Sequence, residues 1–227
     1  MVRKETLFVD NYKVIIITSG KLEQNCYLVK HFESADMLLI DPGGAVNEVK
    51  KAIDEEGGQL KLVLLTHAHF DHVGGVKPLC DHYDLSFWLH SADVKLLKRA
   101  PIYSISMEKR VIEISSDYKH FDGPVVDWGG DQIDIINTPG HTPGSVCFSL
   151  ANMVFTGDII LKEQKVKVEL PGFNNIDLSS SVENLLFNLP AETHFFPGHG
   201  YPDSIGNIRL WWQEVIPRIE NMKIDNL

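Results

Sequence analysis

Short apolar runs recur along the first part of the chain at the lengths typical of buried β-strands. They lie at residues 14–17, 26–29, 37–40 and 62–65. Between the third and fourth runs, Val46, Val49 and Ile53 recur at helical spacing, and Gly57-Gly58 supplies a stop signal. The pattern predicts three strands, a helix and a further buried strand, in that order.

The rest of the chain continues this alternation. We expect strands at 85–89, 133–137, 146–150 and 153–155, with Ala151-Asn152 as a hairpin turn. We expect helices at 73–83, after a cap at Ser91, after a cap at Ser179 or Ser180, and at 208–216, ending near Pro217. Residues 100–127 have weak periodicity and form either a flexible flap over a site or an irregular surface connection. Strands that alternate with helices predict a layered α/β fold.

Length and composition limit the number of domains and the partners. A chain of 227 residues with 44% hydrophobic content can bury a full core, but it is short for two large domains, so one domain over residues 1–227 is expected. The formal net charge of −10 disfavours a nucleic-acid partner, because phosphate binding requires a concentrated basic surface. We expect a monomer or a small homo-oligomer.

Targeting signals and cysteine content bear on the compartment. No apolar run approaches the roughly 18 residues of a membrane span, and residues 1–5 lack the apolar core of a signal peptide. Three cysteines, an odd number, are poor material for a disulfide framework. We therefore expect a cytoplasmic protein that does not contact a membrane.

The most informative chemistry directly follows the fourth apolar run. Residues 66–72 read Thr-His-Ala-His-Phe-Asp-His. If the strand continues extended into the loop, His67 and His69 point to the same side. Asp71 and His72 add a second pair of donors where the chain turns toward a helix. Because imidazole and carboxylate are ligands of zinc and similar divalent metals, the segment predicts two adjacent metal sites.

Further donors follow other expected strands in the same way. His141 lies in Thr-Pro-Gly-His-Thr-Pro-Gly after the strand at 133–137, Asp158 follows Thr-Gly after the strand at 153–155, and His199 lies in Pro-Gly-His-Gly after a short aromatic stretch. Single ligand-type residues just beyond strands are typical of a site presented on loops by a rigid scaffold.

Taken in chain order, these motifs resemble the metallo-β-lactamase superfamily from about residue 25 to about residue 208. The segments Asn25-Cys26-Tyr27 and Ile-Asp-Pro-Gly-Gly at 40–44, with the loops around His141 and His199, are similar to the glyoxalase II-like hydrolases within it. The resemblance implies an αββα sandwich of two mixed β-sheets with helices on the outer faces. Complete glyoxalase II enzymes carry a further helical substrate domain after the last metal-binding histidine, and we expect this chain to lack the full form of it.

Carried over position by position, the resemblance implies two divalent metal ions. One would be held by His67, His69 and His141, the second by Asp71, His72 and His199, and Asp158 would bridge them. Zn²⁺ is favoured, and Fe and Mn also accept nitrogen and oxygen ligands. Since the true β-lactamases of the superfamily carry Cys in place of this bridging Asp, an antibiotic-hydrolysing role is disfavoured.

Residues behind the ligands are also expected to contribute. Asp41 occupies the position of the superfamily's first motif aspartate and is expected to support the metal ligands, since metal-bound imidazoles usually donate their other N–H to a carboxylate or carbonyl. Thr66 and Thr138 are further candidates for such support. Cys147 is expected to be a buried small hydrophobe.

The implied chemistry is hydrolysis. Two metal ions about 3.5–4 Å apart can lower the pKa of bound water from about 15.7 to about 7, so a bridging hydroxide is available at neutral pH. Asp71 would orient the hydroxide and hold its proton, and Asp158 would bridge the metals. A thiolate leaves readily, because a free thiol has a pKa of about 8.5. The expected substrate is a small-molecule thioester or ester, with a hydroxyacylglutathione as the leading choice.

Several alternatives stay open on the sequence. Glyoxalase-like relatives tend to carry a Gly-Arg-Thr-Asp-type segment after the bridging aspartate, whereas this chain has Lys-Val-Lys-Val-Glu-Leu-Pro-Gly at 165–172. Lys165 and Lys167 either bind a substrate carboxylate or form a solvated charged edge. The other functions considered are a mononuclear iron persulfide (sulfur) dioxygenase, a lactonase and a non-catalytic metal-binding module. The matching ligands of the dioxygenase would be His67, His141 and Asp158.

Overall fold

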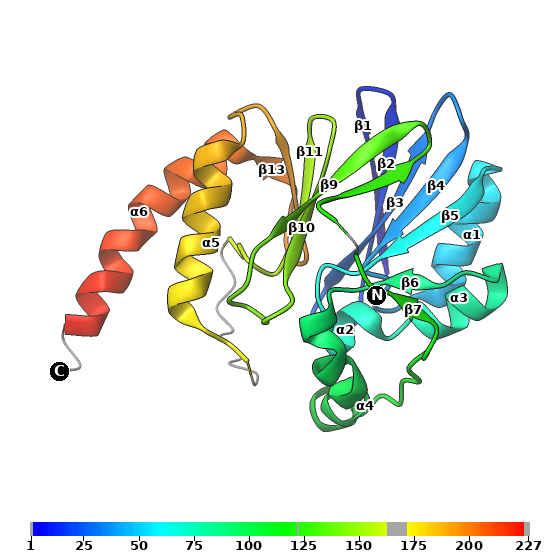
Figure 1. The fold of residues 1–227 in the computed structure, drawn as a ribbon, viewed down its shortest axis with the longest axis horizontal. Helices are drawn as coiled ribbons and strands as arrows, with labels where there is room; N and C mark the ends of the chain where they lie inside the picture. The colour runs from blue at the N-terminus through cyan, green and yellow to red at the C-terminus, as the bar shows by residue number, and fades with distance from the viewer. Residues whose placement is uncertain (1, 122, 163–171, 225–227) are drawn as a thin grey trace.

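The computed structural model describes residues 2–121, 123–162 and 172–224 and contains two β-sheets packed face to face (Figure 1). The strands of the first sheet follow one another across it in sequence order. They are β1 (Arg3–Val9), β2 (Tyr12–Ser19), β3 (Gln24–His31), β4 (Asp36–Ile40), β5 (Gln59–Leu64), β6 (Phe87–Trp88) and β7 (Tyr118–Lys119). Strands β1 to β4 pair antiparallel, and β4 to β7 pair parallel.

The second sheet is built mainly from later parts of the chain. Its spatial order is β13 (Asp203–Ser204), β12 (His194–Pro197), β11 (Met153–Gly157), β10 (Val146–Leu150), β9 (Asp131–Asn137) and β8 (Val125–Trp128). All neighbouring strands pair antiparallel except β11 and β12, which pair parallel. Both sheets are therefore mixed.

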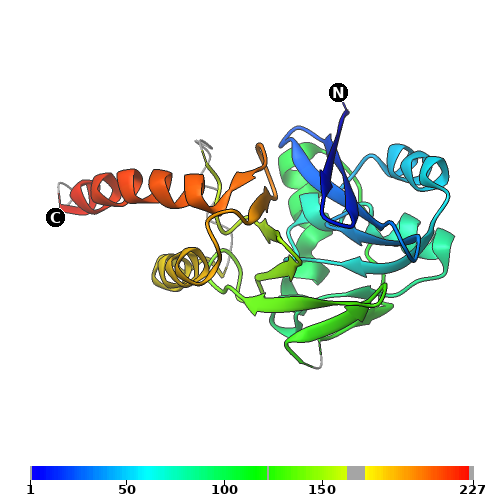
Figure 2. The same ribbon diagram turned by 90° about the horizontal axis from the view of Figure 1, so that it is seen from above.

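Helices cover the outer faces of both sheets (Figures 1 and 2). On the first sheet lie α1 (Val46–Glu56), α2 (Phe70–Val73), α3 (Val76–Tyr83) and α4 (Val94–Glu108), the last preceded by the short 3₁₀ helix η1 (Ser91–Asp93). On the second sheet lie α5 (Asn175–Asn188) and the beginning of α6 (Ile205–Ile224), whose later turns extend away from the sandwich (Figure 2). This is the αββα sandwich expected from the sequence. None of the described helices combines the length and apolar character needed to cross a membrane.

Alternating side chains of the central strands fill separate apolar layers. Ile15 and Ile17 of β2 pack beneath the helices of the first sheet, whereas Val14 and Ile16 pack between the two sheets. A third layer joins the second sheet to α5 and α6. Because β2 is buried on both faces, its apolar run is unbroken rather than alternating with polar residues.

The structure corrects the expected helix at 73–83. The chain forms two helices, α2 and α3, separated at Gly74-Gly75. The Gly75 N–H donates to Pro42 O at 2.8 Å, and a Cβ on Gly74 would lie 2.7 Å from Gly43 O. Close packing against the loop after β4 therefore breaks the helix just after the segment that carries Asp71 and His72.

Two other boundaries also differ from the sequence expectation. Helix α5 begins earlier than expected, because Asn174 caps it by accepting hydrogen bonds from the N–H groups of Ile176 and Asp177; Ser179 and Ser180 lie within the helix. Helix α6 continues through Pro217 to Ile224, since a proline removes one helical hydrogen bond without excluding helical residues on either side.

Residues 100–127 are neither a flap nor a wholly irregular connection. They contribute the second half of α4, strand β7 and most of β8. Their weak sequence periodicity reflects short elements at the margins of both sheets. Strand β1, which carries Arg3, Lys4 and Glu5, was not expected at all, because an exposed edge strand lacks an apolar run.

The layer between the sheets generates a stability prediction. Phe155 is 1% exposed, and its ring centroid lies 5.0 Å from that of Phe196 and 5.2 Å from that of Tyr27. Phe155→Ala should lower the free energy of unfolding by about 3–5 kcal/mol, because it leaves a cavity between the sheets. Phe187→Ala is the matched control, since Phe187 is 88% exposed. Urea denaturation of both variants measures the difference, and equal midpoints would contradict the described core.

Candidate metal centre

The donors expected from the sequence come together on loops that follow the strands. Four lie on the segment after β5 and in α2, one lies between β9 and β10, and one each follows β11 and β12. They are His67, His69, Asp71, His72, His141, Asp158 and His199. All are buried except His141 and Asp158, whose side chains remain 14% and 8% exposed.

Four of these donors form a first group, made of His67, His69, His141 and Asp158. His69 Nδ1 lies 3.2 Å from His67 Nε2 and 2.9 Å from His141 Nε2. Asp158 Oδ2 lies 3.5 Å from His141 Nε2 and 4.0 Å from His67 Nε2. Two nitrogens bound to one tetrahedral zinc, at about 2.0–2.1 Å each, lie roughly 3.3 Å apart. The spacing of this group is therefore that of ligands to a single ion.

A second group contains Asp71, His72 and His199. His199 Nε2 lies 3.2 Å from Asp71 Oδ2 and 3.4 Å from His72 Nε2. Asp158 also reaches this group, since its Oδ2 lies 3.4 Å from His199 Nε2 and its Oδ1 lies 3.2 Å from His72 Nε2. The carboxylate of Asp158 thus contacts both groups, as a bridging ligand must.

Hydrogen bonds behind two of the rings turn the Nε2 atoms of His72 and His199 toward the centre. His72 Nδ1 donates to Asp41 Oδ2 at 2.9 Å, and His199 Nδ1 donates to Leu22 O at 2.8 Å. In a neutral imidazole whose Nδ1 carries the hydrogen, Nε2 presents its lone pair. Such outer hydrogen bonds fix the tautomer and orientation of metal-binding histidines. The residues present fit a metal centre by the chemistry of their donors as well as by spacing.

Asp41 supports the site as expected. Besides His72, it accepts hydrogen bonds from Thr66 N at 2.8 Å and Thr66 Oγ1 at 2.5 Å. Its backbone φ of 51° lies in the left-handed region, a strained conformation for a non-glycine residue that tends to occur at functional sites. The Thr66 hydroxyl also lies 3.0 Å from His67 Nδ1. Asp41 and Thr66 therefore link the ligand loop to the end of β4.

Thr138 does not play the supporting role expected of it. Its hydroxyl lies 3.5 Å from Cys147 Sγ rather than against a donor of either group. Cys147 itself is fully buried, in the layer beneath α5 and α6, as expected for a small hydrophobe. The Thr138 side chain therefore faces the apolar layer of the second sheet, a direction that the sequence pattern did not predict.

Comparison with known proteins establishes the family. Residues 19–199 match the family model of the Metallo-beta-lactamase superfamily. The chain belongs to the metallo-β-lactamase superfamily. It is 29% identical to the hydroxyacylglutathione hydrolase GloC of Haemophilus influenzae over 201 residues, which cover 86% of this chain and 93% of that protein.

Solved structures of the superfamily have the same fold. The crystal structure of TTHA1623 in a di-iron-bound form is 33% identical, with a TM-score of 0.75, and the match covers 83% of this chain and 93% of that one. The crystal structure of the BLEG-1 B3 metallo-beta-lactamase is 28% identical, with a TM-score of 0.77, and covers 86% and 94% of the two chains. Together these metallo-β-lactamase relatives support a metal-dependent hydrolase.

The two groups of this metallo-β-lactamase site differ in their electrostatics. Burial lowers the pKa of His67 well below its usual range, lowers that of His69 to about 3 and also lowers that of His141, so these rings stay neutral. Burial also opposes charge on His72 and His199, but neighbouring carboxylates, Asp158 foremost, raise the pKa of His72 well above its usual range and that of His199 to about 10. The second group thus lies in a strongly anionic environment, which favours a cation.

Asn25 holds the loop that carries His199, a role that the sequence motif alone did not indicate. Its side-chain Nδ2 donates to Gly200 O at 2.9 Å and Pro197 O at 3.1 Å, and its backbone N–H donates to Gly198 O at 2.8 Å. Asp93 is a second residue that sequence reasoning missed, because it lies outside every motif. Its carboxylate contacts the loops on either side of the first group.

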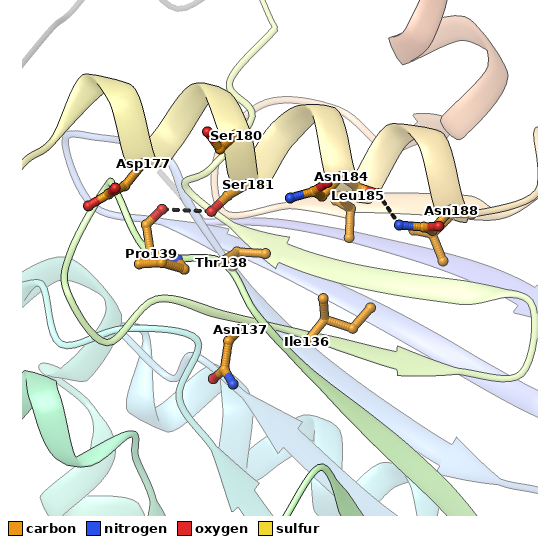
Figure 3. A pocket seen from close by; sticks show the side chains of 11 residues that line it. Ile136, Asn137, Thr138, Pro139, Asp177, Ser180, Ser181, Asn184, Leu185 and Asn188 are labelled. Atoms are coloured by element: carbon orange, nitrogen blue, oxygen red, sulfur yellow. Dashed lines mark hydrogen bonds between the residues drawn. The ribbon is translucent and has the colours of Figure 1, made fainter.

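The remaining histidines, and a cavity beside α5, lie outside the centre. His31, His82, His90, His120 and His194 belong to neither group, as expected. A cavity of about 280 Å³ lies between β9 and α5 and is lined by none of the donors (Figure 3). Ser181 Oγ donates to Pro139 O at 2.7 Å along its wall, so α5 braces the segment before His141.

The two groups of donors predict the metal content. Purified protein should contain close to two transition-metal ions per chain, because one ion uses only three or four donors. His69→Ala, which removes a donor from the first group alone, should reduce the content to about one ion. His194→Ala is the control, since His194 is an exposed residue in β12. Elemental analysis after gel filtration measures all three proteins, and a wild-type content of one ion would contradict the two-metal interpretation.

Proposed function

We propose that this chain is a dinuclear metal-dependent hydrolase that cleaves a small-molecule thioester, with a hydroxyacylglutathione as the favoured substrate. The observation that carries the proposal is the pair of donor groups that share the Asp158 carboxylate. The similarity to GloC, whose name describes hydroxyacylglutathione hydrolysis, supports the substrate class. We also propose a cytoplasmic location, on the sequence features given above.

In this proposal, each donor is assigned to one of the two metal ions or to the bridge between them. His67, His69 and His141 hold one metal ion, Asp71, His72 and His199 hold the other, and Asp158 bridges the two. This use of all the donors favours hydrolysis over a mononuclear dioxygenase, which would leave the Asp71, His72 and His199 group unused. Zinc, iron and manganese all accept this donor set, and the di-iron form of TTHA1623 supports iron as well as zinc.

Two bound cations would supply a nucleophilic hydroxide at neutral pH and would polarise the substrate carbonyl. The side chains around the metal ions then determine which group accepts the proton released during hydrolysis. Asp71 is buried, and its Oδ2 lies 3.2 Å from His199 Nε2, so one oxygen faces the second group while the carboxylate can accept a proton. A thiolate needs no strong general acid to leave, which suits a site whose first group consists mainly of neutral histidines.

A substrate panel tests this function. Metal-loaded protein is assayed with a hydroxyacylglutathione, a simple thioester, a lactone, a β-lactam and glutathione persulfide, the last with oxygen uptake. The proposal expects the highest kcat/KM with the hydroxyacylglutathione. Oxygen consumption with the persulfide would assign the dioxygenase instead. Preferential β-lactam cleavage would assign the activity named for BLEG-1, and a lactone preference would assign a lactonase.

Asp71 should matter for turnover. Asp71→Asn keeps the shape of the side chain but removes its charge and proton-accepting capacity, so kcat should fall at least about 10²-fold, the usual scale for a lost acid or base. Asp81→Asn is the matched control, because Asp81 lies on the surface and pairs with Lys77. Steady-state kinetics under full metal loading decides the point. An unchanged kcat in Asp71→Asn would show that the proton-transfer role is wrong.

Asp158→Ala tests the bridge between the groups. It should abolish hydrolysis and lower the metal content while the fold remains, because the pairing of β11 with β10 and β12 does not use this side chain. Circular dichroism and elemental analysis accompany the assay. Near-normal turnover in a folded Asp158→Ala variant would refute the dinuclear assignment. Lys165 and Lys167 lie outside the described residues, so their contact with substrate stays a prediction from sequence.

A further inference from the structure

The carboxylate of Asp93 lies between two loops that carry donors of the first group. Asp93 ends η1 at the start of α4 and is 0% exposed. Its Oδ2 accepts hydrogen bonds from Ala68 N at 2.9 Å and from Thr142 Oγ1 at 2.8 Å. Its Oδ1 accepts one from Gly144 N at 2.8 Å. One buried side chain therefore joins a loop of the first sheet to a loop of the second.

These loops are the ones that place the imidazoles of the first group. Ala68 lies between His67 and His69, and Thr142 directly follows His141. The distance between His69 Nδ1 and His141 Nε2 is 2.9 Å, so a shift of a few tenths of an ångström in one loop would change the shared geometry. Asp93 thus acts on the part of the centre where ligands from the two sheets meet.

The hydrogen bonds of Asp93 do not serve its own helix. An aspartate at a helix N-cap ordinarily accepts a hydrogen bond from the first-turn N–H groups of that helix. Asp93 occupies the N-cap of α4, but its side chain makes no such bond, and its carboxylate accepts from the two ligand loops instead. The Asp93 side chain therefore connects the two loops instead of capping α4.

Gly144 permits this arrangement. A Cβ at Gly144 would lie 2.7 Å from both Asp93 Cγ and Asp93 Oδ1, closer than real Cβ atoms approach other groups. The absence of a side chain lets the Gly144 backbone N–H reach the carboxylate. The close approach is independent evidence that the two loops are fitted around Asp93.

We propose that Asp93 is a positioning residue that holds the His67–His69 loop and the His141 loop at the separation required for the first metal ion. The inference rests on the proposed metal centre but not on the identity of the substrate. The loops are also joined by the bond from Val146 N to Thr66 O, at 2.9 Å, so loss of Asp93 changes their relative position without separating the sheets.

Asp93→Asn is the sharpest change, because it preserves size and removes acceptor capacity. The amide NH₂ group must occupy the place of Oδ1 or Oδ2, and each of these faces a backbone N–H, that of Gly144 or that of Ala68. In either orientation two donors meet and one buried N–H loses its partner. The donor–donor repulsion in this variant should therefore displace either the Ala68 loop or the Gly144 loop from residue 93, while the packing around α4 is kept.

The test measures metal affinity separately for each group. In a His199→Ala background, which disables the second group, Co²⁺ is titrated into metal-free protein and its visible absorption is followed. Adding Asp93→Asn should weaken Co²⁺ binding about 10- to 100-fold, as is typical when an outer hydrogen-bond partner of a metal ligand is lost, and should change the absorption bands. In a His69→Ala background, which leaves the second group, the same substitution should leave the affinity unchanged.

Two further variants keep the test decisive. Thr142→Val removes one of the three hydrogen bonds to Asp93, together with the 2.8 Å contact between the Thr142 hydroxyl and Ser145 Oγ. It should weaken the first site in the same direction by a smaller factor, and it replaces Asp93→Asn in the test if that variant does not fold. Asp81→Asn is the control for the chemical change and should alter neither site, because Asp81 is a surface residue paired with Lys77.

The outcomes separate this inference from the proposed function. Unchanged Co²⁺ affinity and spectra in folded Asp93→Asn, or equal weakening of both sites, would overturn the positioning role. Wild-type protein that binds no Co²⁺ would overturn the proposed metal centre and this inference with it. Selective weakening of the first site, in a protein that hydrolyses no thioester, would support the positioning role and contradict only the proposed substrate.

Discussion

The burial of carboxylates among histidines at the ends of the strands is the constraint on which the rest of the structure depends. Asp41, Asp71 and Asp158 are largely or fully removed from water, and buried charges are costly unless they are paired or bind a metal. His72 and His199 lie against these groups, and their raised pKa values reflect the anionic surroundings. A divalent cation would balance this charge, so the electrostatics and the donor geometry point to the same chemistry.

The sandwich places the donors by bringing the ends of strands from both sheets together. β5 of the first sheet leads directly into the His67 loop, and β9, β11 and β12 of the second sheet lead into the loops of His141, Asp158 and His199. The apolar layer between the sheets holds these strands rigidly, because interiors are closely packed. The core therefore fixes the positions of the loops, and the loops carry the donor side chains.

A few polar contacts connect the loops once the core has brought them near one another. Asp41 reaches His72, Asn25 holds the segment around His199, and Asp93 joins the His67–His69 loop to the His141 loop. These side chains are buried, so their hydrogen bonds are costly to break. They contact different groups of donors: Asp93 contacts loops of the first group, and Asn25 contacts the His199 loop of the second group.

The sequence by itself determined the long buried strands, the first helix and the donors, because these features depend on local patterns. Unbroken apolar runs predict strands buried on both faces, and ligand-type residues packed within a few positions indicate a metal site. The tertiary structure alone decided the contact of Thr138 with Cys147, the break between α2 and α3 and the hydrogen bonds of Asp93. These features arise from contacts such as Asp93 to Thr142 and Gly75 to Pro42. Such partners are distant in sequence, so no local pattern of residues records which of them will meet.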